Sequence, residues 1–468
     1  MKRGEELILT LGGFALEGKS VARLEGLVVF VTGAVPGDTV RVRLTKIKKT
    51  FCEAEALEVL APSEERTKPQ CRYFGVCGGC RWQNVRYDAQ LMFKRQHVID
   101  ALERIGGFQG IGVRPTLGCD QPYHYRNKME FSFGQRWLSR EEMTAQHDTG
   151  TKGPSFALGL HLPGRFDRVL DLEECWLQSE LSVGIVNHVR LFALEHQLTV
   201  YSTFTHEGFL RNLVVRQSKQ TGEVMVNLVT RDDRPDIMTS FTAALLANFP
   251  EITTVCNNIT ERKSQVAIGD RERVYHGPGY INEKIGTRLY RISANSFFQT
   301  NTLQAECLYD TARTFARLTP TDVVYDLYSG TGTIALHIAD HVRSVVGVES
   351  TPAAVEDAHR NAAVNGVGNC RFLLGDLREL LTKEKNLVAE SGKPEVIILD
   401  PPRAGMHEDV VRSVMELSPE RIVYVSCNPA TQARDLKMMA QQYRITDVQP
   451  VDMFPHTFHI ENVVALSR

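Results

Sequence analysis

The last third of the chain repeats one pattern, in which a short apolar run is followed by a polar or glycine-containing loop and then by a helical stretch. The first clear run is 323–327, which is followed by Tyr328 and by Gly330-Thr331-Gly332. Such alternation is typical of a doubly wound parallel sheet, and the ligands of these sheets bind beside the carboxyl ends of the strands. We therefore predict a Rossmann-like α/β domain over residues 291–468, with its site at the strand ends.

Residues 1–62 have a different pattern, with short apolar strands broken by glycine and proline. In the run 39–44, Arg41 and Arg43 alternate with apolar residues, so one face of this strand is basic. The pattern predicts an OB-like β-barrel. Such barrels bind nucleic acid on a basic face, although a merely solvated surface has the same pattern. Between these regions, residues 63–290 mix helical and strand-like runs, which predicts a central α+β domain.

One helix of the central region is clearly marked, over residues 88–105. Its apolar residues recur along one face, so it should pack against a neighbouring core. Asp88 is a suitable N-cap for this helix, and Gly106-Gly107 should end it.

The composition is that of an ordinary globular protein rather than a polycation, with 54 Lys and Arg against 56 Asp and Glu. A net charge of −2 does not exclude an RNA partner, because local patches matter more than the sum. No apolar run is long enough to span a bilayer, and the first residues lack the apolar core of a secretory signal. We expect a cytoplasmic protein that acts as a monomer and does not engage a membrane.

Three cysteines, Cys71, Cys77 and Cys80, lie within ten residues around Gly78-Gly79, which allows a tight turn. Three thiolates at one point suit a soft metal centre, either zinc or an iron–sulfur cluster, and three unrelated buried cysteines are the less favoured interpretation. Both centres usually take a fourth ligand. Spacing does not choose among the candidates Cys52, Cys119, Cys175 and Cys256.

The strand ends of the C-terminal domain carry the groups of a nucleoside-binding site. Glu349 follows the run 344–348 and can accept both hydroxyls of a ribose, and Asp376 follows the run 371–374, where it can reach an adenine. No G-x-G-x-x-G fingerprint is present, so a dinucleotide site is disfavoured. This combination favours S-adenosylmethionine over a cofactor such as NAD.

Two later strand ends carry reactive groups. Asp400 follows an apolar run and precedes Pro401-Pro402, which fix a rigid loop at the ligand crevice. Cys427 follows the next run and precedes Asn428-Pro429, which stop the strand. A cysteine in such a place is more often a small buried hydrophobe, but a thiol in the ligand crevice can also serve as a nucleophile.

Taken in order, these motifs resemble the RNA 5-methyluridine methyltransferase family, in its iron–sulfur branch with an N-terminal TRAM domain. The resemblance covers nearly the whole chain. It is carried by Gly18, Ala22-Arg23, Pro36-Gly37-Asp38, the three-cysteine segment and residues 125–132, 171–177, 293–301, 400–405, 426–429 and 454–464. One departure is Ser329, which stands in the glycine loop where several relatives have cysteine.

The resemblance implies an enzyme that methylates carbon 5 of a uridine in 23S rRNA, with S-adenosylmethionine as methyl donor and a bound [4Fe-4S] cluster. It makes Cys175 the fourth ligand, because Asp171-Leu-Glu-Glu-Cys175-Trp-Leu177 matches the family's segment. It makes Cys427 the nucleophile and Glu461 the general base. The cofactor contacts that it implies are Gln299, Tyr328, Glu349, Asp376 and Asp400.

The chemistry explains why these residue types are needed. Carbon 5 of uracil is a poor nucleophile, and a thiolate added to carbon 6 turns the ring into an enolate that can accept a methyl group. A carboxylate is a sufficient base to remove the carbon 5 proton before the thiolate leaves.

Other functions stay open at this stage. The RNA could be a transfer RNA, or the acceptor could be an exocyclic amino group, because a related Asp/Asn-Pro-Pro loop occurs in amino methyltransferases. A third hypothesis is an RNA-binding protein without catalytic activity that keeps the methyltransferase fold. Cys427 and Glu461, both intact, argue against this last hypothesis.

Overall fold

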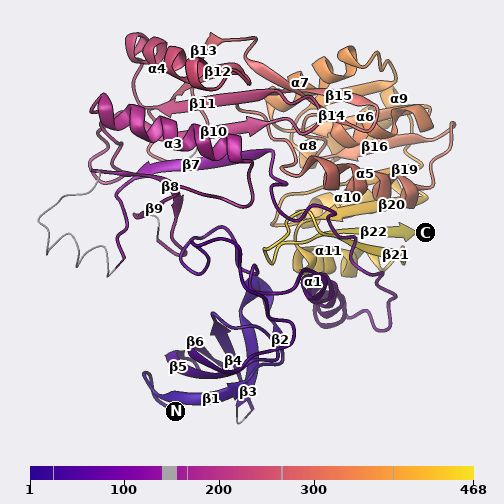
Figure 1. The fold of residues 1–468 in the computed structure, drawn as a ribbon. Coiled ribbons are helices and arrows are strands. Elements are labelled where there is room, and N and C mark those ends of the chain that lie inside the picture. Colours follow the sequence, from indigo (N-terminus) through magenta and orange to yellow (C-terminus); the bar gives the residue numbers. More distant parts are fainter. Residues whose placement is uncertain (25, 140–154, 166, 265–266, 383) are drawn as a thin grey trace, which may run out of the picture.

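The computed structural model describes residues 1–468 except 25, 140–154, 166, 265–266 and 383. Three large sheets follow one another along the chain. The N-terminal sheet stands apart from the rest of the molecule, and the two larger sheets lie side by side (Figure 1). None of the helices in the described residues is long and apolar enough to cross a membrane.

The N-terminal sheet has six strands in the order β1-β5-β6-β4-β3-β2. Its strands are β1 (Glu6–Thr10), β2 (Gly13–Phe14), β3 (Ser20–Leu24), β4 (Leu27–Thr32), β5 (Thr39–Ile47) and β6 (Phe51–Ala61). The alternation in β5 is confirmed, because Val40, Val42 and Leu44 are buried in the core of this sheet. A β-rich N-terminal region is therefore confirmed.

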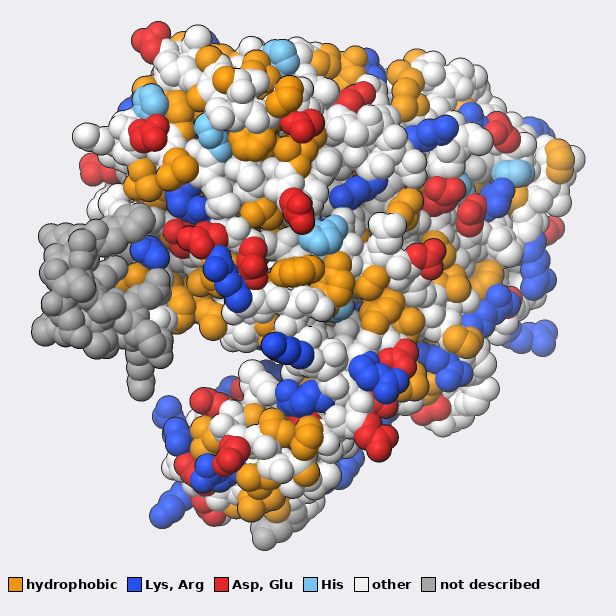
Figure 2. All heavy atoms as spheres, viewed as in Figure 1, with side chains coloured by type: hydrophobic (Ala, Val, Ile, Leu, Met, Phe, Trp, Pro, Cys, Tyr) orange, Lys and Arg blue, Asp and Glu red, His pale blue; other side chains and the backbone are white. Residues whose placement is uncertain are grey.

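The basic face predicted for β5 is largely neutralised. Arg41 pairs with Glu58 at 2.6 Å, and Arg43 pairs with Glu6 at 3.0 Å, in both cases across neighbouring strands. On the face shown in Figure 2, basic and acidic side chains are interspersed over this sheet. Arg41 and Arg43 are therefore compensated, because the facing strands supply carboxylates in register. Binding of nucleic acid by this sheet stays a prediction.

The central sheet has seven strands in the order β13-β12-β11-β10-β7-β8-β9. Its strands are β7 (Lys128–Gly134), β8 (Ala157–His161), β9 (Val169–Asp171), β10 (Leu210–Gln217), β11 (Val224–Thr230), β12 (Ile252–Ile259) and β13 (Arg271–His276). Helices α3 (Glu180–Glu195) and α4 (Pro235–Asn248) pack on it and share its apolar core. This arrangement of strands and helices is the α+β architecture that the sequence predicts for this region.

The marked helix of the central region packs on the C-terminal domain instead. It is α1 (Tyr87–Ala101), continued by one π-helical turn, η2 (Leu102–Gly106), and ended by Gly107 in the left-handed region. The N-cap is Arg86 rather than Asp88, which lies in the first turn. Val98 and Leu102 enter the core of the C-terminal sheet. The predicted division at residues 62 and 290 stays a prediction, since this helix falls within 63–290 in sequence but packs on the C-terminal sheet.

The C-terminal sheet has seven strands in the order β18-β17-β16-β19-β20-β22-β21. Its strands are β16 (Val323–Leu327), β17 (Ser344–Glu349), β18 (Cys370–Leu374), β19 (Val396–Leu399), β20 (Arg421–Ser426), β21 (Arg444–Val451) and β22 (Glu461–Ser467). The helices that accompany them are α5 (Thr302–Ala316), α6 (Thr333–Ile338), η3 (Ala339–His341), α7 (Pro352–Val364), α8 (Leu377–Thr382), α9 (Glu384–Ser391), α10 (Glu408–Leu417) and α11 (Pro429–Met439).

The first five strands in this order pair in parallel, whereas β22 runs antiparallel to both of its neighbours. The doubly wound α/β fold is therefore confirmed, because buried apolar strands alternate with helices along the chain. A hairpin of β14 (Tyr280–Ile285) and β15 (Arg288–Ser293) lies before this sheet and contacts α5, α6 and α7.

Candidate active site

The end of β20 brings the predicted nucleophile beside the predicted base. β20 pairs antiparallel with β22, so that Ser426 lies opposite Asn462 and the next residue along each strand end, Cys427, lies beside Glu461. The register therefore joins two residues that lie far apart in the sequence, and their charges influence each other.

Local sequence explains why Cys427 leaves the strand where it does. Asn428 is the N-cap of α11, and its side chain accepts a hydrogen bond from the Ala430 N–H at 3.1 Å. Pro429 occupies the first turn of the helix, where its missing N–H costs nothing. The strand therefore stops at Ser426, as the sequence predicts, and Cys427 is left in the turn between strand and helix.

Gln432 of α11, which sequence reasoning missed, clamps the two strand ends. Its amide donates to the carbonyl oxygens of Tyr424 at 2.8 Å and Asn462 at 3.1 Å. It also accepts a hydrogen bond from the Asn462 side chain at 2.7 Å. A glutamine four residues after Asn428 is the sequence signal for such a clamp, but its partner on β22 is visible only in the folded chain.

Buried carboxyl groups crowd this edge of the sheet. Burial, and then the charge of Asp400, raise the pKa of Glu461 well above its usual range, whereas Arg403 lowers it. Burial also raises the pKa of Asp400 to about 7. Burial, and then the charge of Asp400, also raise the pKa of Asp326, in β16, to about 7. These groups cannot all be ionised at neutral pH, so protons are held at this edge of the sheet.

Arg403 is the cation of the site, and sequence reasoning did not single it out. Burial raises the pKa of the Cys427 thiol to about 11, and the charge of Glu461 adds to this effect. Arg403 opposes both through its charge and a side-chain hydrogen bond to Cys427. Asn428 ties the two loops together, since its amide donates to the Arg403 carbonyl at 3.0 Å. The sequence did carry a signal, because Arg403 directly follows the Asp400-Pro401-Pro402 motif.

A cavity of about 290 Å³ opens onto Cys427. Its lining includes Arg403, Phe458 and His459. Burial, and then the charge of Arg403, lower the pKa of His459 to about 4, so this ring is neutral. The cavity is of the size that takes one small ligand, and its lining holds both apolar and polar groups.

A second cavity, of about 300 Å³, lies at the ends of β16, β17 and β18. Tyr328, Glu349 and Asp376 line it, as the sequence predicts, whereas Gln299 and Asp400 are not among its lining residues. Glu349 accepts hydrogen bonds from the N–H groups of Gly330 at 3.1 Å and Thr351 at 2.8 Å. Further lining residues that the sequence did not indicate are Arg378 and His407. The two cavities lie at the same edge of one sheet, as a donor site and an acceptor site must.

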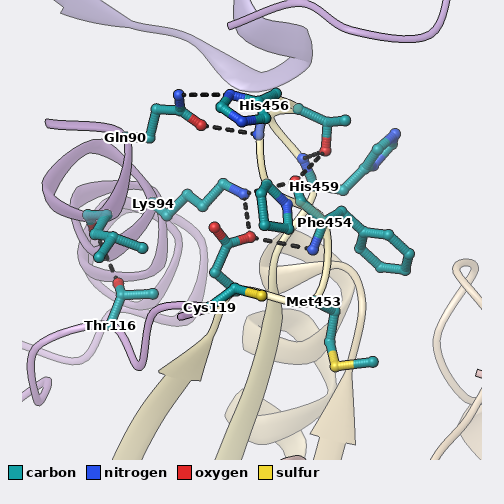
Figure 3. A network of polar contacts seen from close by, with 12 residues as sticks. Gln90, Lys94, Thr116, Cys119, Met453, Phe454, His456 and His459 are labelled. Carbon is teal, nitrogen blue, oxygen red and sulfur yellow. Dashed lines mark hydrogen bonds and ion pairs between the residues drawn. The ribbon is translucent and has the colours of Figure 1, made fainter. Parts of the chain in front are cut away.

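The loop that leads to Glu461 is held by a buried ion pair (Figure 3). Lys94 of α1 lies 2.5 Å from the carboxylate of Asp452, and neither side chain is exposed to solvent. Asp452 also accepts hydrogen bonds from the Tyr87 hydroxyl at 2.9 Å and the Phe454 N–H at 3.1 Å. Helix α1 therefore fixes the start of the loop whose end carries His459 and Glu461.

The cysteine segment touches the same loop from the other side. The N–H groups of Arg81 and Trp82 donate to the His456 carbonyl at 2.9 and 3.0 Å. His456 has a φ of 65°, a left-handed conformation that a histidine adopts only when its surroundings hold it. Tyr123 stacks on its ring with the ring centres 4.2 Å apart.

Cys175 is the candidate fourth ligand that the structure brings to the three-cysteine segment. Its charge acts on Cys71, Cys77 and Cys80, whose thiols also act on one another. Cys119 packs nearby, but its thiol donates to the Gln121 carbonyl at 3.2 Å. The remaining candidates, Cys52 and Cys256, are buried in other cores.

The cysteine segment packs closely against β8. Gly78 lies so close to β8 that a Cβ at this position would be 2.7 Å from the His161 carbonyl oxygen. Burial raises the pKa of Cys77 to about 11 and that of Cys80 to about 12, so these thiols stay protonated unless a cation joins them. Among the described residues, no group of three or more His, Cys, Asp or Glu side chains is arranged to hold a metal ion.

The fold and the two cavities define a methyltransferase of the S-adenosylmethionine-dependent class. Residues 265–468 match the tRNA (Uracil-5-)-methyltransferase family, and residues 2–57 match the TRAM domain. The chain is 45% identical to an uncharacterized RNA methyltransferase of Chlorobaculum tepidum, a match that covers 100% of this chain and 97% of the relative. An uncharacterized RNA methyltransferase of Bacteroides thetaiotaomicron is 44% identical, over 97% of this chain and 99% of the relative.

A solved structure extends the match to the whole fold. The tRNA (uracil-54, C5)-methyltransferase of Pyrococcus abyssi, in complex with S-adenosyl-L-homocysteine, has a TM-score of 0.74 and 30% sequence identity. The match covers 98% of this chain and 100% of that one. The chain therefore belongs to the RNA uracil-5-methyltransferase family with a TRAM domain. It is an S-adenosylmethionine-dependent RNA (uracil-C5)-methyltransferase, as the sequence motifs predict.

Proposed function

We propose that this enzyme methylates its uridine through a covalent bond between Cys427 and carbon 6 of the uracil. The observation that supports this mechanism is the register of β20 and β22, which brings the buried Glu461 beside Cys427. Arg403 lines the cavity that opens onto Cys427. S-adenosylmethionine supplies the methyl group at the neighbouring cavity and leaves as S-adenosylhomocysteine. Tyr328 and Glu349 line that cavity and would hold the cofactor, with Asp376 at its exposed rim.

Cys427 acts first. Burial raises the pKa of its thiol to about 11, so the partly exposed thiol must pass its proton to solvent as the base binds. The guanidinium of Arg403 favours the thiolate, and the thiolate sulfur then forms a bond to carbon 6. The electron pair of the 5,6 double bond moves onto carbon 5 and the 4-carbonyl, which gives the enolate that takes the methyl group.

Glu461 completes the reaction. After methyl transfer, carbon 5 bears both the methyl group and its original proton. A carboxylate whose pKa is raised is a stronger base once it is ionised, and Glu461 lies beside the thiol that must leave. Removal of the proton restores the 5,6 double bond and expels the Cys427 thiolate. Asp400 would orient the base or the methyl donor from the adjacent strand end.

Two variants test this mechanism. Cys427→Ala should bind S-adenosylhomocysteine normally and form neither product nor adduct. Glu461→Gln should form the covalent protein–RNA adduct and release it slowly, so that a slower band accumulates on a denaturing gel. Product formation by Cys427→Ala, or full turnover by Glu461→Gln, would contradict the mechanism.

We also propose 23S rRNA as the substrate, because a TRAM domain together with the cysteine segment resembles the rRNA-modifying branch. The Pyrococcus abyssi relative is named for a transfer RNA, which supports the alternative substrate. Methyl incorporation into 23S rRNA and tRNA transcripts by the purified enzyme distinguishes the two substrate hypotheses. Incorporation into tRNA alone would overturn the proposal. An RNA substrate also agrees with the expected cytoplasmic location, and sedimentation of the free enzyme tests the expected monomer.

We propose that Cys71, Cys77, Cys80 and Cys175 hold a four-iron cluster. The mutual action of their thiols supports this, as does the partial burial that raises the pKa of Cys77 and Cys80. Each thiolate of such a cluster binds a different iron, so its ligands stand further apart than those of a single ion. The cluster would fix the turn that holds the His456 carbonyl. Iron and sulfide analysis of protein purified without oxygen tests it, and zinc without iron would contradict it.

A further inference from the structure

A groove of about 560 Å³ lies between the cysteine segment and the central sheet. Its walls come from Gly78-Gly79, from β7 with the residues before it, and from the turn after β8. It is separate from the cavities that open onto Cys427 and Glu349. Neither the proposed mechanism nor the proposed cluster uses it.

The groove is basic. Arg81, Arg126 and Lys128 line it, against the single carboxylate of Glu130. Lys128 lies 2.5 Å from Glu130 and neutralises it. Within the described part of the chain, Arg81 and Arg126 form no ion pair with a carboxylate, unlike the arginines of the N-terminal sheet. Two guanidinium groups are therefore left to face a ligand.

Polar atoms on the groove wall also lack partners. The Nε of Arg126 and the Oγ1 of Thr300 are buried and make no hydrogen bond within the protein. Thr300 and Arg126 both line the groove. A donor and a hydroxyl that stay unsatisfied are costly unless a ligand or water completes them. The Arg126 guanidinium also contacts the Met129 sulfur at 3.6 Å and the Tyr125 side chain.

The groove lies next to the reaction site. The guanidinium carbon of Arg126 is 6.0 Å from the centre of the Phe454 ring, which in turn is 6.1 Å from the ring of His459. His459 lines the cavity of Cys427 and feels the charge of Arg126. The adjacent Asn127 binds the carbonyls of Gln299 and Thr300 at 2.8 Å. A chain that leaves the Cys427 cavity past His459 therefore reaches Arg126 next.

We propose that this groove binds a phosphodiester of the RNA substrate beside the target uridine, with Arg126 and Arg81 as its anion-binding residues. Guanidinium groups match phosphate oxygens with paired hydrogen bonds and stay charged when partly buried. An RNA strand supplies phosphates at the spacing of successive nucleotides, and a groove of about 560 Å³ has room for more than one phosphate group. This proposal rests on the proposed function, because it assumes that uracil enters the Cys427 cavity.

The test measures binding of a substrate RNA stem–loop at several salt concentrations, with Arg81→Gln and Arg126→Gln. Each variant should bind about tenfold more weakly, and the slope of log K against log salt should lessen by about 0.7 for each phosphate that is no longer neutralised. Arg273→Gln is the matched control. Arg273 lies in β13, at the far side of the same sheet from β7, and it pairs with Asp233 at 2.5 Å.

Arg81→Gln keeps the test decisive if Arg126→Gln disturbs the fold, because the Arg81 side chain is exposed. Binding of S-adenosylhomocysteine should stay unchanged in each variant. Wild-type RNA affinity and salt dependence in Arg81→Gln would overturn the proposal, as would an equal loss of affinity in Arg273→Gln. A failure of the mechanism would appear elsewhere, as product formation by Cys427→Ala with RNA affinity still dependent on Arg81.

Discussion

The two thiol sites of this protein share a residue type and differ in what surrounds it. Cys427 lies at a strand end, beside a buried carboxyl group and within reach of Arg403. Cys71, Cys77, Cys80 and Cys175 lie on loops and face mainly one another. Burial raises the thiol pKa at both sites, so exposure does not separate a nucleophile from a ligand. The neighbouring charges differ, because Arg403 favours the Cys427 thiolate, whereas the four grouped thiols raise one another's pKa. The proposed roles of nucleophile and metal ligand rest on this difference.

The largest effect should separate the two sites directly. Cys427→Ser should reduce methylation by more than about 1,000-fold, because a hydroxyl is a far weaker nucleophile than a thiolate. Iron content should be unchanged in this variant. Cys80→Ser should instead lose iron and keep the reactive Cys427 thiol. Rates of methyl transfer and metal analysis of both variants check this. Loss of iron from Cys427→Ser would show that the sites are not independent.

The second-largest effect concerns the loop between β21 and β22, which lies between the two thiol sites and is held by Lys94 through Asp452. Lys94→Met should lower the free energy of unfolding by about 3 kcal/mol, because it leaves the buried carboxylate of Asp452 without its cation. The double variant Lys94→Met/Asp452→Asn should recover part of this loss, since no charge is then buried alone. Denaturant unfolding measures both.

If the Lys94–Asp452 ion pair only stabilised the fold, Lys94→Met would not change the rate at which the covalent protein–RNA adduct is released. If the pair also positions Glu461, then Lys94→Met enzyme that remains folded should accumulate the covalent adduct, as Glu461→Gln does. Normal adduct release in folded Lys94→Met would limit Lys94 to a role in stability.

A smaller effect concerns the cation that distinguishes Cys427. Arg403 lowers the pKa of the thiol, so Arg403→Met should raise that pKa further above about 11. The rising limb of the pH–rate profile for adduct formation should therefore move to higher pH. Because the Arg403 side chain is exposed and screened, we expect about a tenfold loss of rate at neutral pH. A profile that does not move would remove Arg403 from thiol activation.

The smallest effect should come from the cysteine that lies near the cluster site without joining it. Cys119→Ser should leave the iron content unchanged, because its thiol already donates to the Gln121 carbonyl. The free energy of unfolding should change by less than about 1 kcal/mol, as expected when one weak hydrogen bond is exchanged for another. Cys175→Ser is the comparison and should lose iron. Equal iron loss in the two variants would reopen the choice of fourth ligand.

Much of the fold could be predicted because its signals are local. The runs that become β16, β17 and β19 are apolar and end in polar or glycine residues, and the structure confirms these strands within one or two residues. The end of β20 was predictable for the same reason, since Asn428-Pro429 both stops the strand and begins α11. The N-cap of α1 was not, because Asp88 pairs with Arg86 in the first turn instead of capping the helix.

Sequence alone determined the enzyme class, through motifs that resemble one family, and the doubly wound C-terminal sheet, through hydrophobic periodicity. It also proposed the reactive residues. Only the tertiary structure decided which of these residues meet. It placed Glu461 beside Cys427 through an antiparallel register, and it brought Cys175 to the cysteine segment from another part of the chain. It also neutralised Arg41 and left Arg126 facing a groove. The physical reason is that charge, burial and hydrogen bonding act through space, between residues whose separation along the chain says nothing about their distance.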